Sequence, residues 1–207
     1  SYKLVEQVQG RGVYSFCMCP GGFIVPAATA NDELVVNGMS PSKRDNLFAN
    51  SGIVVAIEPQ DLKPYSKYGA LAGLQYQREV EKAVWQAGGK DQTAPAQRLT
   101  DFVKGKASSS LNDCSYIPGL KSAPMHQVLP NPIAVRLREA FPRFGQKMKG
   151  YYTEEANIVG TESRTSSPVR IPRKKDTLQH PQVDNLFPCG EGAGYAGGII
   201  SAALEGY

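Results

Sequence analysis

The sequence predicts an α+β fold with a mixed or antiparallel sheet and a helical insertion. Short β-prone runs fill the first 60 residues, helical periodicity dominates from about residue 69 to residue 150, and β-prone runs return after that. Because strands and helices fall into separate blocks, this order fits an α+β domain better than a series of βαβ units. The sequence contains no internal repeat of the kind that indicates a solenoid.

The first block contains short runs that we expect to be strands: GVYSFCM (12–18), GFIVPAA (22–28), ELVVNG (33–38) and GIVVAIEP (52–59). Pro20-Gly21-Gly22 provides a turn signal between the first two runs. The polar stretch of residues 39–51, which separates the last two runs, is expected to be a loop.

The middle block predicts helices. The face of the first one follows the i, i+4, i+8 spacing, with the apolar positions Ala72, Tyr76, Val80, Ala83 and Val84. Gly88-Gly89 should end this helix, because glycine readily adopts the left-handed conformation of a helix C-terminus. A second helix is expected to start near Pro95 and to stop at Gly105.

A third helix should open within residues 129–141, with Asn131 as the N-cap and Pro132 at the first helical position. Pro142 should kink or end it, because proline removes one backbone hydrogen bond and its ring clashes with the preceding turn. The β-prone runs that follow are ANIVGTES (156–163) and SPVRIP (167–172).

Composition argues against several classes of protein. The chain has 207 residues and a net charge of +4, which by itself is too small to indicate nucleic-acid binding. No apolar run approaches the roughly 18 residues needed to span a bilayer, and the N-terminal residues lack the apolar core of a signal peptide. Four cysteines in a chain of this length do not form a disulfide scaffold, so a cytoplasmic protein is expected.

The glycine-rich stretch FPCGEGAGYAGGIISAALEGY (187–207) raises the question of a nucleotide site. Residues 192–197 match G-x-G-x-x-G, but a Rossmann unit needs a second strand and an acidic residue about 20 positions further on. Only ten residues follow Gly197, so we do not expect a free-standing dinucleotide fold. A helix N-terminus after these glycines would still attract an electron-rich or anionic group. Alternatively, the glycines only permit tight helix packing.

Several motifs occur in one order along the chain: SFCMCPGGFIVPA (15–27), VVNGMS (35–40), ANSGIVV (49–55), ESRTSSPVRI (162–171) and LFPCGEGAGYAGGI (186–199). In this order they resemble a family of FAD-dependent dehydrogenases, and the similarity extends over most of the chain. The last motif is also similar to the C-terminal flavin motif of two-domain FAD-dependent oxidoreductases. The motifs therefore suggest a flavoprotein.

The resemblance implies that residues 1–183 form a substrate-side domain, with a helical segment at about 69–150. Residues 184–207 would be the last strand, loop and helix of a Rossmann-like FAD domain. Members of the family begin with an N-terminal FAD domain that carries its own G-x-G-x-x-G turn for the pyrophosphate. The chain is therefore expected to be a C-terminal fragment, whose partner is the missing N-terminal FAD domain, and to bind FAD weakly or not at all by itself.

Carried over by position, the resemblance implies a cofactor-binding loop made of Gly190, Glu191, Gly192, Ala193, Gly194 and Tyr195. Glu191 would hold the ribityl chain of FAD. The N–H groups of residues 192–194 would lie near the pyrimidine edge of the flavin, where a helix dipole stabilises negative charge on the reduced ring. Tyr195 would line the ring or serve in packing.

Cys17 and Cys19 are a second candidate for chemistry. If this run is extended, both thiols point to the same face, where they could relay electrons as a dithiol/disulfide pair beside the flavin. Buried cysteines are commonly inert, so packing is the alternative role. The two histidines, His126 and His180, lie far away in sequence, so no metal site is expected.

The run ESRTSSP places Arg164 next to Thr165 and Ser166. A fixed cation and hydroxyl donors could orient an acidic substrate or the carbonyl edge of the flavin, while a hydrogen-bonded loop with a surface arginine explains the run equally well. A basic cluster follows, made of Arg170, Arg173, Lys174 and Lys175. It could contact phosphates, but we expect a solvated loop because no aromatic residues are interleaved.

We therefore expect the C-terminal part of an FAD-dependent oxidoreductase that exchanges hydride or electrons between flavin and a small-molecule substrate. NADH or NADPH is a candidate electron donor, and neither nucleic acid nor a membrane is an expected partner. One alternative is a non-catalytic ligand- or partner-binding module that has lost flavin binding. Another is a protein that binds an anion or nucleotide at the terminal helix, which Glu191 disfavours because its carboxylate repels phosphate.

Overall fold

The computed structural model describes residues 4–207 and divides into two compact units. Unit 1 consists of the chain up to Asp61 together with Arg78–Ser163. Unit 2 consists of Leu62–Gln77 and Arg164–Tyr207. Among the described residues, no helix is long and apolar enough to cross a membrane.

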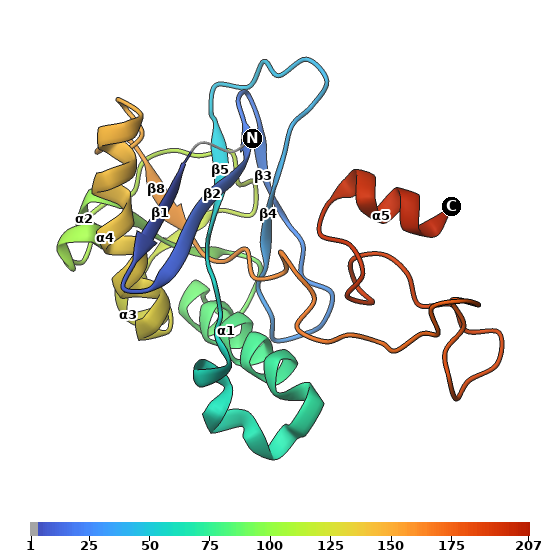
Figure 1. Cartoon of the computed structure of the whole chain (residues 1–207). Helices are drawn as coiled ribbons and strands as arrows, with labels where there is room; N and C mark the ends of the chain where they lie inside the picture. The colour runs from blue at the N-terminus through green and yellow to red at the C-terminus, as the bar shows by residue number, and fades with distance from the viewer. Residues whose placement is uncertain (1–3) are drawn as a thin grey trace. The chain divides into compact units, whose positions relative to one another are not determined.

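Unit 1 contains small sheets rather than one continuous sheet (Figure 1). The first is antiparallel in the order β1-β2-β5, made of β1 (Val5–Val8), β2 (Arg11–Cys19) and β5 (Asn50–Val55). The second pairs β3 (Phe23–Pro26) with β4 (Val36–Met39), also antiparallel. In the third, β6 (Ala94–Arg98) runs parallel to β7 (Leu120–Ser122) and antiparallel to β8 (Asn157–Val159). The predicted mixed α+β class is confirmed.

A two-residue turn joins β1 to β2. Val8 pairs with Arg11, and the intervening Gln9 and Gly10 both have positive φ, 49° and 76°. This is the left-handed geometry of a type I′ hairpin turn, whose twist matches that of the paired strands. The turn therefore sets the register that brings Arg11 to the start of β2.

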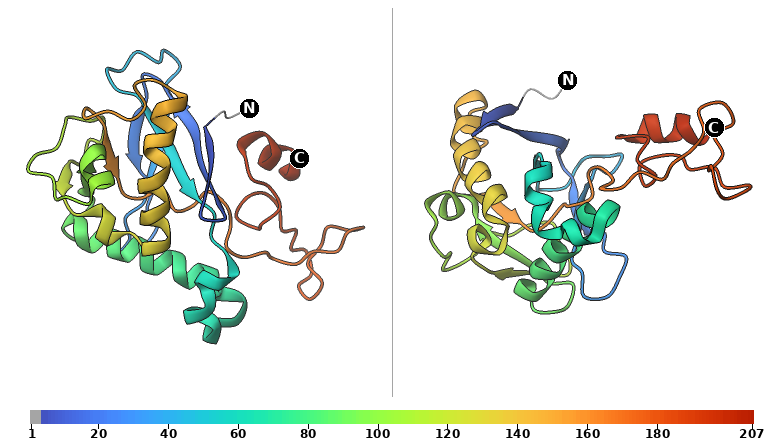
Figure 2. Two further views of the ribbon diagram at one scale, coloured as in Figure 1. Left: turned by 60° about the vertical axis from the view of Figure 1, so that its left-hand side comes forward. Right: turned by 60° about the horizontal axis from the view of Figure 1, so that its bottom comes forward.

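The helices and the 3₁₀ segment are η1 (Pro59–Leu71), α1 (Ala72–Gly88), α2 (Leu99–Lys104), α3 (Met125–Val128), α4 (Asn131–Lys147) and α5 (Ile199–Gly206). In unit 1, α4 packs against β1, β2 and β5 (Figure 2). Its buried residues Leu137, Phe141 and Phe144 follow the i, i+4, i+7 spacing of one helix face. The side chain of Phe144 is fully enclosed and makes edge-to-face contacts with Phe141 and Tyr151.

A smaller hydrophobic cluster in unit 1 contains Leu34, Val84 and Tyr116. Leu34 and Val84 are completely buried, and the Tyr116 hydroxyl donates to the carbonyl oxygen of Gln92 at 2.7 Å. Val84 belongs to the α1 face that the helical spacing predicted. Burial of apolar surface in these two clusters supplies the main driving force for folding of unit 1.

Two expectations about the helices are wrong. The region from Pro95 begins as strand β6, and helix α2 starts only at Leu99. Ala94 and Ala96 are fully buried, and β6 pairs with strands on both sides, so tertiary pairing decides the conformation of a short segment. Pro142 was expected to kink or end the third helix, and the second of these outcomes is wrong: α4 continues through Pro142 to Lys147, because burial of Phe141 and Phe144 offsets one lost backbone bond.

Unit 2 has little regular structure besides most of η1, the first residues of α1 (72–77) and α5. The expected strand at residues 167–172 is absent, and no strand precedes the loop within residues 184–198. A strand needs a neighbour to satisfy its backbone groups, and no strand lies in the described residues of unit 2. Turns and side-chain hydrogen bonds satisfy backbone groups of unit 2 instead.

Candidate functional site

The glycine-rich loop of unit 2 is a compact turn. Gly190 and Gly194 have φ values of 72° and 82°, in the left-handed region that favours glycine. The N–H of Gly194 donates to the carbonyl oxygen of Glu191, and the N–H of Tyr195 donates to that of Gly190, both at 3.0 Å. Helix α5 begins at Ile199, after the glycines, so residues 192–194 belong to this turn and precede the helix N-terminus.

One side of this turn is open. A Cβ atom built on Gly190 or Gly192 would have no neighbour within 4 Å. Within the part of the chain that the structure describes, the N–H groups of Gly192 and Ala193 donate to no backbone carbonyl. A flat, electron-rich group can therefore approach the backbone at Gly192 and find donors there, which fits the edge of a flavin.

The other side of the turn packs against the segment that follows ESRTSS. A Cβ atom on Gly194 would lie 2.8 Å from the carbonyl oxygen of Val169 and 3.1 Å from the Cα of Arg170, too close for any side chain. The N–H of Ile171 donates to the carbonyl oxygen of Ala193 at 3.1 Å. Glycine at position 194 is thus required both by its φ and by this approach.

Ser167 links the two predicted site segments. Its Oγ lies 3.1 Å from the carbonyl oxygen of Gly192 and 2.7 Å from that of Val169, and one hydroxyl proton serves these two acceptors. The three residues predicted for substrate or flavin contact precede it. Arg164 is half-buried and takes part in other interactions, while Ser166 is exposed. Thr165 has a buried Oγ1 without a hydrogen-bond partner in the described part of the chain.

Tyr195 is held between arginine side chains. The guanidinium carbons of Arg170 and Arg173 lie 4.2 Å and 3.8 Å from its ring centre, and its hydroxyl donates to the carbonyl oxygen of Ile171 at 2.9 Å. Guanidinium groups at such distances are attracted by the ring face. The expectation of a merely solvated basic loop is therefore wrong for these two arginines. Both contact the ring of Tyr195, which lies 22 or more residues further along the chain.

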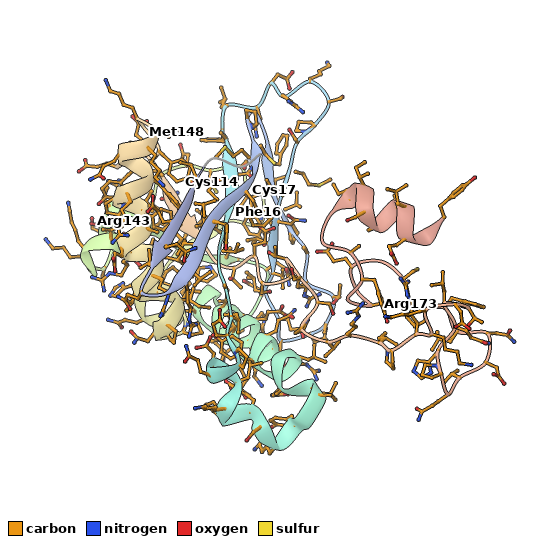
Figure 3. All side chains as sticks on the ribbon, viewed as in Figure 1. Phe16, Cys17, Cys114, Arg143, Met148 and Arg173 are labelled. Carbon is orange, nitrogen blue, oxygen red and sulfur yellow. The ribbon has the colours of Figure 1, made fainter. Side chains whose placement is uncertain are left out.

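Arg173 makes further contacts in unit 2 (Figure 3). It donates to the carbonyl oxygen of Pro188 at 2.9 Å and forms an ion pair with Glu205 of α5 at 2.7 Å. The hydrogen bond from Arg173 lowers the pKa of Glu205, despite an opposing effect of desolvation. Arg173 thus connects the start of the loop, Tyr195 and α5. The spacing of the arginines and the tyrosine in the sequence does not reveal this role of Arg173.

The cysteines of β2 do not share a face. A bulge interrupts the pairing of β2 with β5 between Phe16 and Cys19, and Cys17 there has a φ of 48° (Figure 3). Cys17 is exposed and Cys19 is buried, and the Cys19 Sγ lies 3.3 Å from the carbonyl oxygen of Cys17. The premise of an extended run is therefore wrong, and neither cysteine forms a disulfide. A redox role for Cys17 and Cys19 stays a prediction.

Cys19 lies in surroundings that favour the neutral thiol. Burial raises the pKa of Cys19, the charge of Glu162 raises it further, and Arg44 partly opposes both. Burial also raises the pKa of Glu162, whose Oε2 occupies the space that a Cβ atom on Gly52 would need. Among residues 4–207, no group of three or more metal-ligating side chains comes together.

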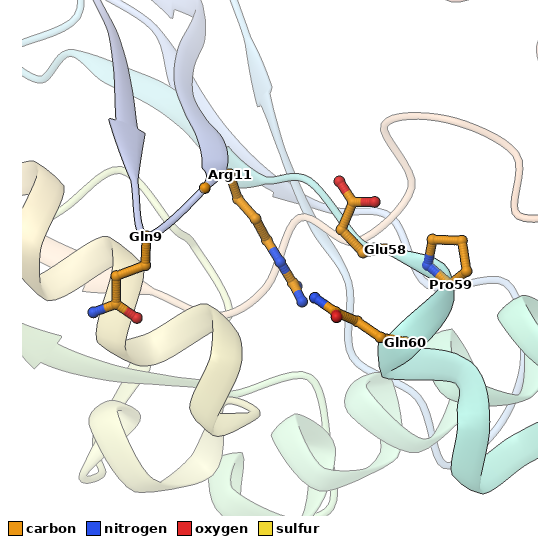
Figure 4. Close-up of a pocket in the computed structure, with 6 residues that line it drawn as sticks. Gln9, Arg11, Glu58, Pro59 and Gln60 are labelled. Atoms are coloured by element: carbon orange, nitrogen blue, oxygen red, sulfur yellow. The ribbon is translucent and has the colours of Figure 1, made fainter.

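Unit 1 also has an open hollow of about 520 Å³ beside the β1–β2 turn (Figure 4). It is lined by Gln9, Gly10, Arg11, Glu58, Pro59 and Gln60. The Arg11 guanidinium donates to both carboxylate oxygens of Asp61, at 2.5 Å and 2.9 Å. This hollow contains none of the residues that the sequence predicted for a site, and the charge of Arg11 is already balanced.

Residues 1–165 match the family described as FAD-dependent protein, C-terminal domain-like. The chain belongs to this family. The match confirms the resemblance to an FAD-dependent family that the motifs indicated, and it associates the chain with FAD. It covers unit 1 and residues 62–77 of unit 2 and ends at Thr165, within the ESRTSS segment, so the glycine-rich loop lies beyond it.

The loop is nevertheless covered by similarity to a relative. An uncharacterized protein of Clostridium beijerinckii is 44% identical to the chain over 209 residues, which is 99% of this chain and 38% of that protein. Because almost all of this chain is aligned, the region after residue 165 is included. The chain spans well under half the length of this relative.

Proposed function

We propose that this chain supplies the substrate-side domain and the flavin-facing loop of an FAD-dependent oxidoreductase. Membership of the family supports the association with FAD. The observation that carries the proposal is the packing of residues 167–171 against residues 192–194. It joins the segment expected at the flavin edge or substrate to the segment expected at the flavin itself.

FAD, when bound, would supply hydride or electron transfer. The N–H groups of Gly192 and Ala193 would meet the electron-rich edge of the ring, where an oriented donor stabilises developing negative charge. The carboxylate of Glu191 would accept hydrogen bonds from ribityl hydroxyls. Arg164, Thr165 and Ser166 would orient a substrate with an acidic group.

The exposed apolar side chains of helix α5 support the proposal that unit 2 packs against a larger partner. Ile199, Ile200 and Leu204 are 89%, 74% and 73% exposed. Covering such apolar side chains is favourable by roughly 25 cal/mol per Å². In this proposal the FAD domain of the longer family protein covers them, so the chain alone binds FAD weakly. A nicotinamide nucleotide would serve as electron donor.

A chimera tests this function. The matching region of the Clostridium beijerinckii relative would be replaced by this chain, and the purified protein would be mixed with FAD, separated from unbound FAD by gel filtration and examined by visible absorption. We expect a bound-flavin band in the chimera and none in the isolated chain. Reduction of that band by NADH or NADPH under anaerobic conditions would then establish the donor.

Matched variants sharpen the test. Ser167→Ala removes the hydroxyl that fixes the Gly192 carbonyl and should weaken flavin binding, whereas Ser42→Ala, at an exposed serine of unit 1, should not. A β-branched residue, as in Gly192→Val or Gly194→Val, should abolish flavin binding while unit 1 stays folded. A folded chimera that binds no flavin would instead favour a non-catalytic binding module, and undiminished binding in both valine variants would show that the loop does not face the ring.

A further inference from the structure

The two arginines that stack on Tyr195, Arg170 and Arg173, differ in their other contacts. Arg173 is committed to Glu205 and to the carbonyl oxygen of Pro188, and its side chain is only 13% exposed. Arg170 is exposed, and no carboxylate lies within ion-pair distance of it in the described part of the chain. The cluster therefore holds two guanidinium groups and one carboxylate, Glu205, whose pKa is lowered mainly by the hydrogen bond from Arg173 and also by the charge of Arg170. One positive charge is left over, and Arg170 is the more exposed of the two arginines.

Contacts of its backbone and its side chain hold the Arg170 guanidinium in one position. The backbone of Arg170 is held against Gly194, with its Cβ 3.2 Å from the position that a Cβ of Gly194 would occupy. Its guanidinium is stacked on the Tyr195 ring, which is itself anchored through the hydroxyl to Ile171. A stacked guanidinium loses less freedom when it binds a ligand, and its planar donors match the oxygens of an anion.

The surroundings favour a doubly charged ligand. Lys174 and Lys175 follow on the same exposed segment, and neither forms an ion pair within the described residues. Cations this close in sequence make the segment 170–175 locally positive, which attracts a phosphate group with nearly two negative charges more strongly than a single carboxylate. Asp176 and Glu191 are the nearby acidic residues in sequence, and neither pairs with Arg170.

We propose that Arg170, stacked on Tyr195 beside the glycine-rich loop, is the primary contact of a binding site for the phosphate group of a small ligand. Lys174 and Lys175 add attraction to this site without defining its geometry. Arg173 positions Tyr195 and does not contact the ligand. The site needs no flavin, so it stands or falls independently of the function proposed above.

The test is a titration of the ¹⁵N-labelled chain with pyrophosphate at constant ionic strength, followed by NMR. The Nε–Hε signal of Arg170 and the amide signals of Gly194 and Tyr195 should shift together and saturate with one dissociation constant. Arg170→Gln should weaken binding by about tenfold or more, because it removes a charge-assisted contact. Lys175→Gln removes the same charge from the same segment and should weaken binding by about twofold or less.

The other outcomes overturn the proposal. Equal loss in Arg170→Gln and Lys175→Gln would mean diffuse electrostatic attraction without a built site. Equal shifts with acetate at matched ionic strength would show that the site selects no phosphate. Saturable binding that leaves the Arg170 and Tyr195 signals unchanged would place the ligand elsewhere. Spectral dispersion in the same experiment shows whether each variant remains folded.

Discussion

Unit 1 encloses large apolar side chains such as Phe102, Phe144 and Leu34, whereas unit 2 leaves the apolar side chains of α5 exposed and fixes its loop through polar contacts. Both arrangements specify a conformation, but they differ in energy and cooperativity. A close-packed core stabilises by several kcal/mol per large residue, while a neutral hydrogen bond contributes about 1 kcal/mol net. Unit 1 is thus built for stability, and unit 2 for the placement of a few groups.

The largest expected effect tests the core of unit 1. Phe144→Ala should lower the free energy of unfolding by about 3–5 kcal/mol, because it removes a fully buried ring and leaves a cavity. Leu204→Ala, at a residue of α5 that is 73% exposed, should change it by about 0.5 kcal/mol or less. Urea unfolding measures the free energy of unfolding of unit 1 when it is followed by the fluorescence of Trp85, the single tryptophan of the chain. Similar losses in both variants would contradict the contrast between the units.

The next effect concerns the buried ion pair of unit 1. Desolvation opposes ionisation of Asp61, but hydrogen bonds from Arg11 and from the Glu58 N–H, with the charges of Arg11 and Arg136, outweigh it and lower the pKa of Asp61. Asp61→Asn should cost about 3 kcal/mol, because the buried Arg11 loses its counter-charge.

The lowered pKa also predicts the pH dependence of this contribution. It should be fully present above the unfolded-state pKa of about 3.9 and disappear as pH falls through the lower folded-state value. Unfolding curves at stepwise lower pH should therefore show less acid sensitivity in Asp61→Asn than in the parent protein. Asp45→Asn is the matched control, because it removes an exposed carboxylate without unpairing the buried Arg11. An unaltered profile in Asp61→Asn would argue against this pair as a source of acid sensitivity.

A smaller effect is expected in unit 2. Gly194→Ala should destabilise the loop by about 1–3 kcal/mol, since alanine is strained at φ 82° and would meet the Val169 carbonyl oxygen. Gly192→Ala places its methyl group in open space and should leave the loop intact. Hydrogen exchange of the Ile171 amide reports the difference, because that amide donates to Ala193. Equal exchange rates in the two variants would show that the close approach at Gly194 is not needed.

The sequence predicted the elements of unit 1 far better than those of unit 2. Strands β2 to β5 and helices α1 and α4 follow from alternation, helical spacing and turn residues, which are local signals. The strand β6 was missed because its conformation depends on pairing with β7 and β8, which follow it in the chain. The run SPVRIP (167–172) in unit 2 was expected to be a strand, but the described residues of this unit contain no strand with which it could pair.

The candidate site was predicted as residue types but not as an arrangement. The motifs supplied the glycine-rich loop and the ESRTSS run, yet the contact that joins them uses Ser167 and backbone groups of Val169 and Ile171. Backbone groups are present in every residue, so sequence alone cannot single them out. The same holds for Arg170 and Arg173, whose roles depend on a ring more than 20 positions away. The boundary expected at residues 183 and 184 stays a prediction.

The hydrogen bond from Arg173 to the carbonyl oxygen of Pro188 holds together the two ends of the segment that lies between them. Residues 174–187 therefore form a closed loop whose two ends are fixed by contacts inside unit 2. For a flexible closed loop the entropy of closure grows slowly, by about 0.6 kcal/mol for each doubling of its length. Insertions or deletions of several residues in this closed loop should therefore leave Tyr195 and the glycine-rich loop in place, which makes it the natural position for a peptide tag or a variable segment in relatives.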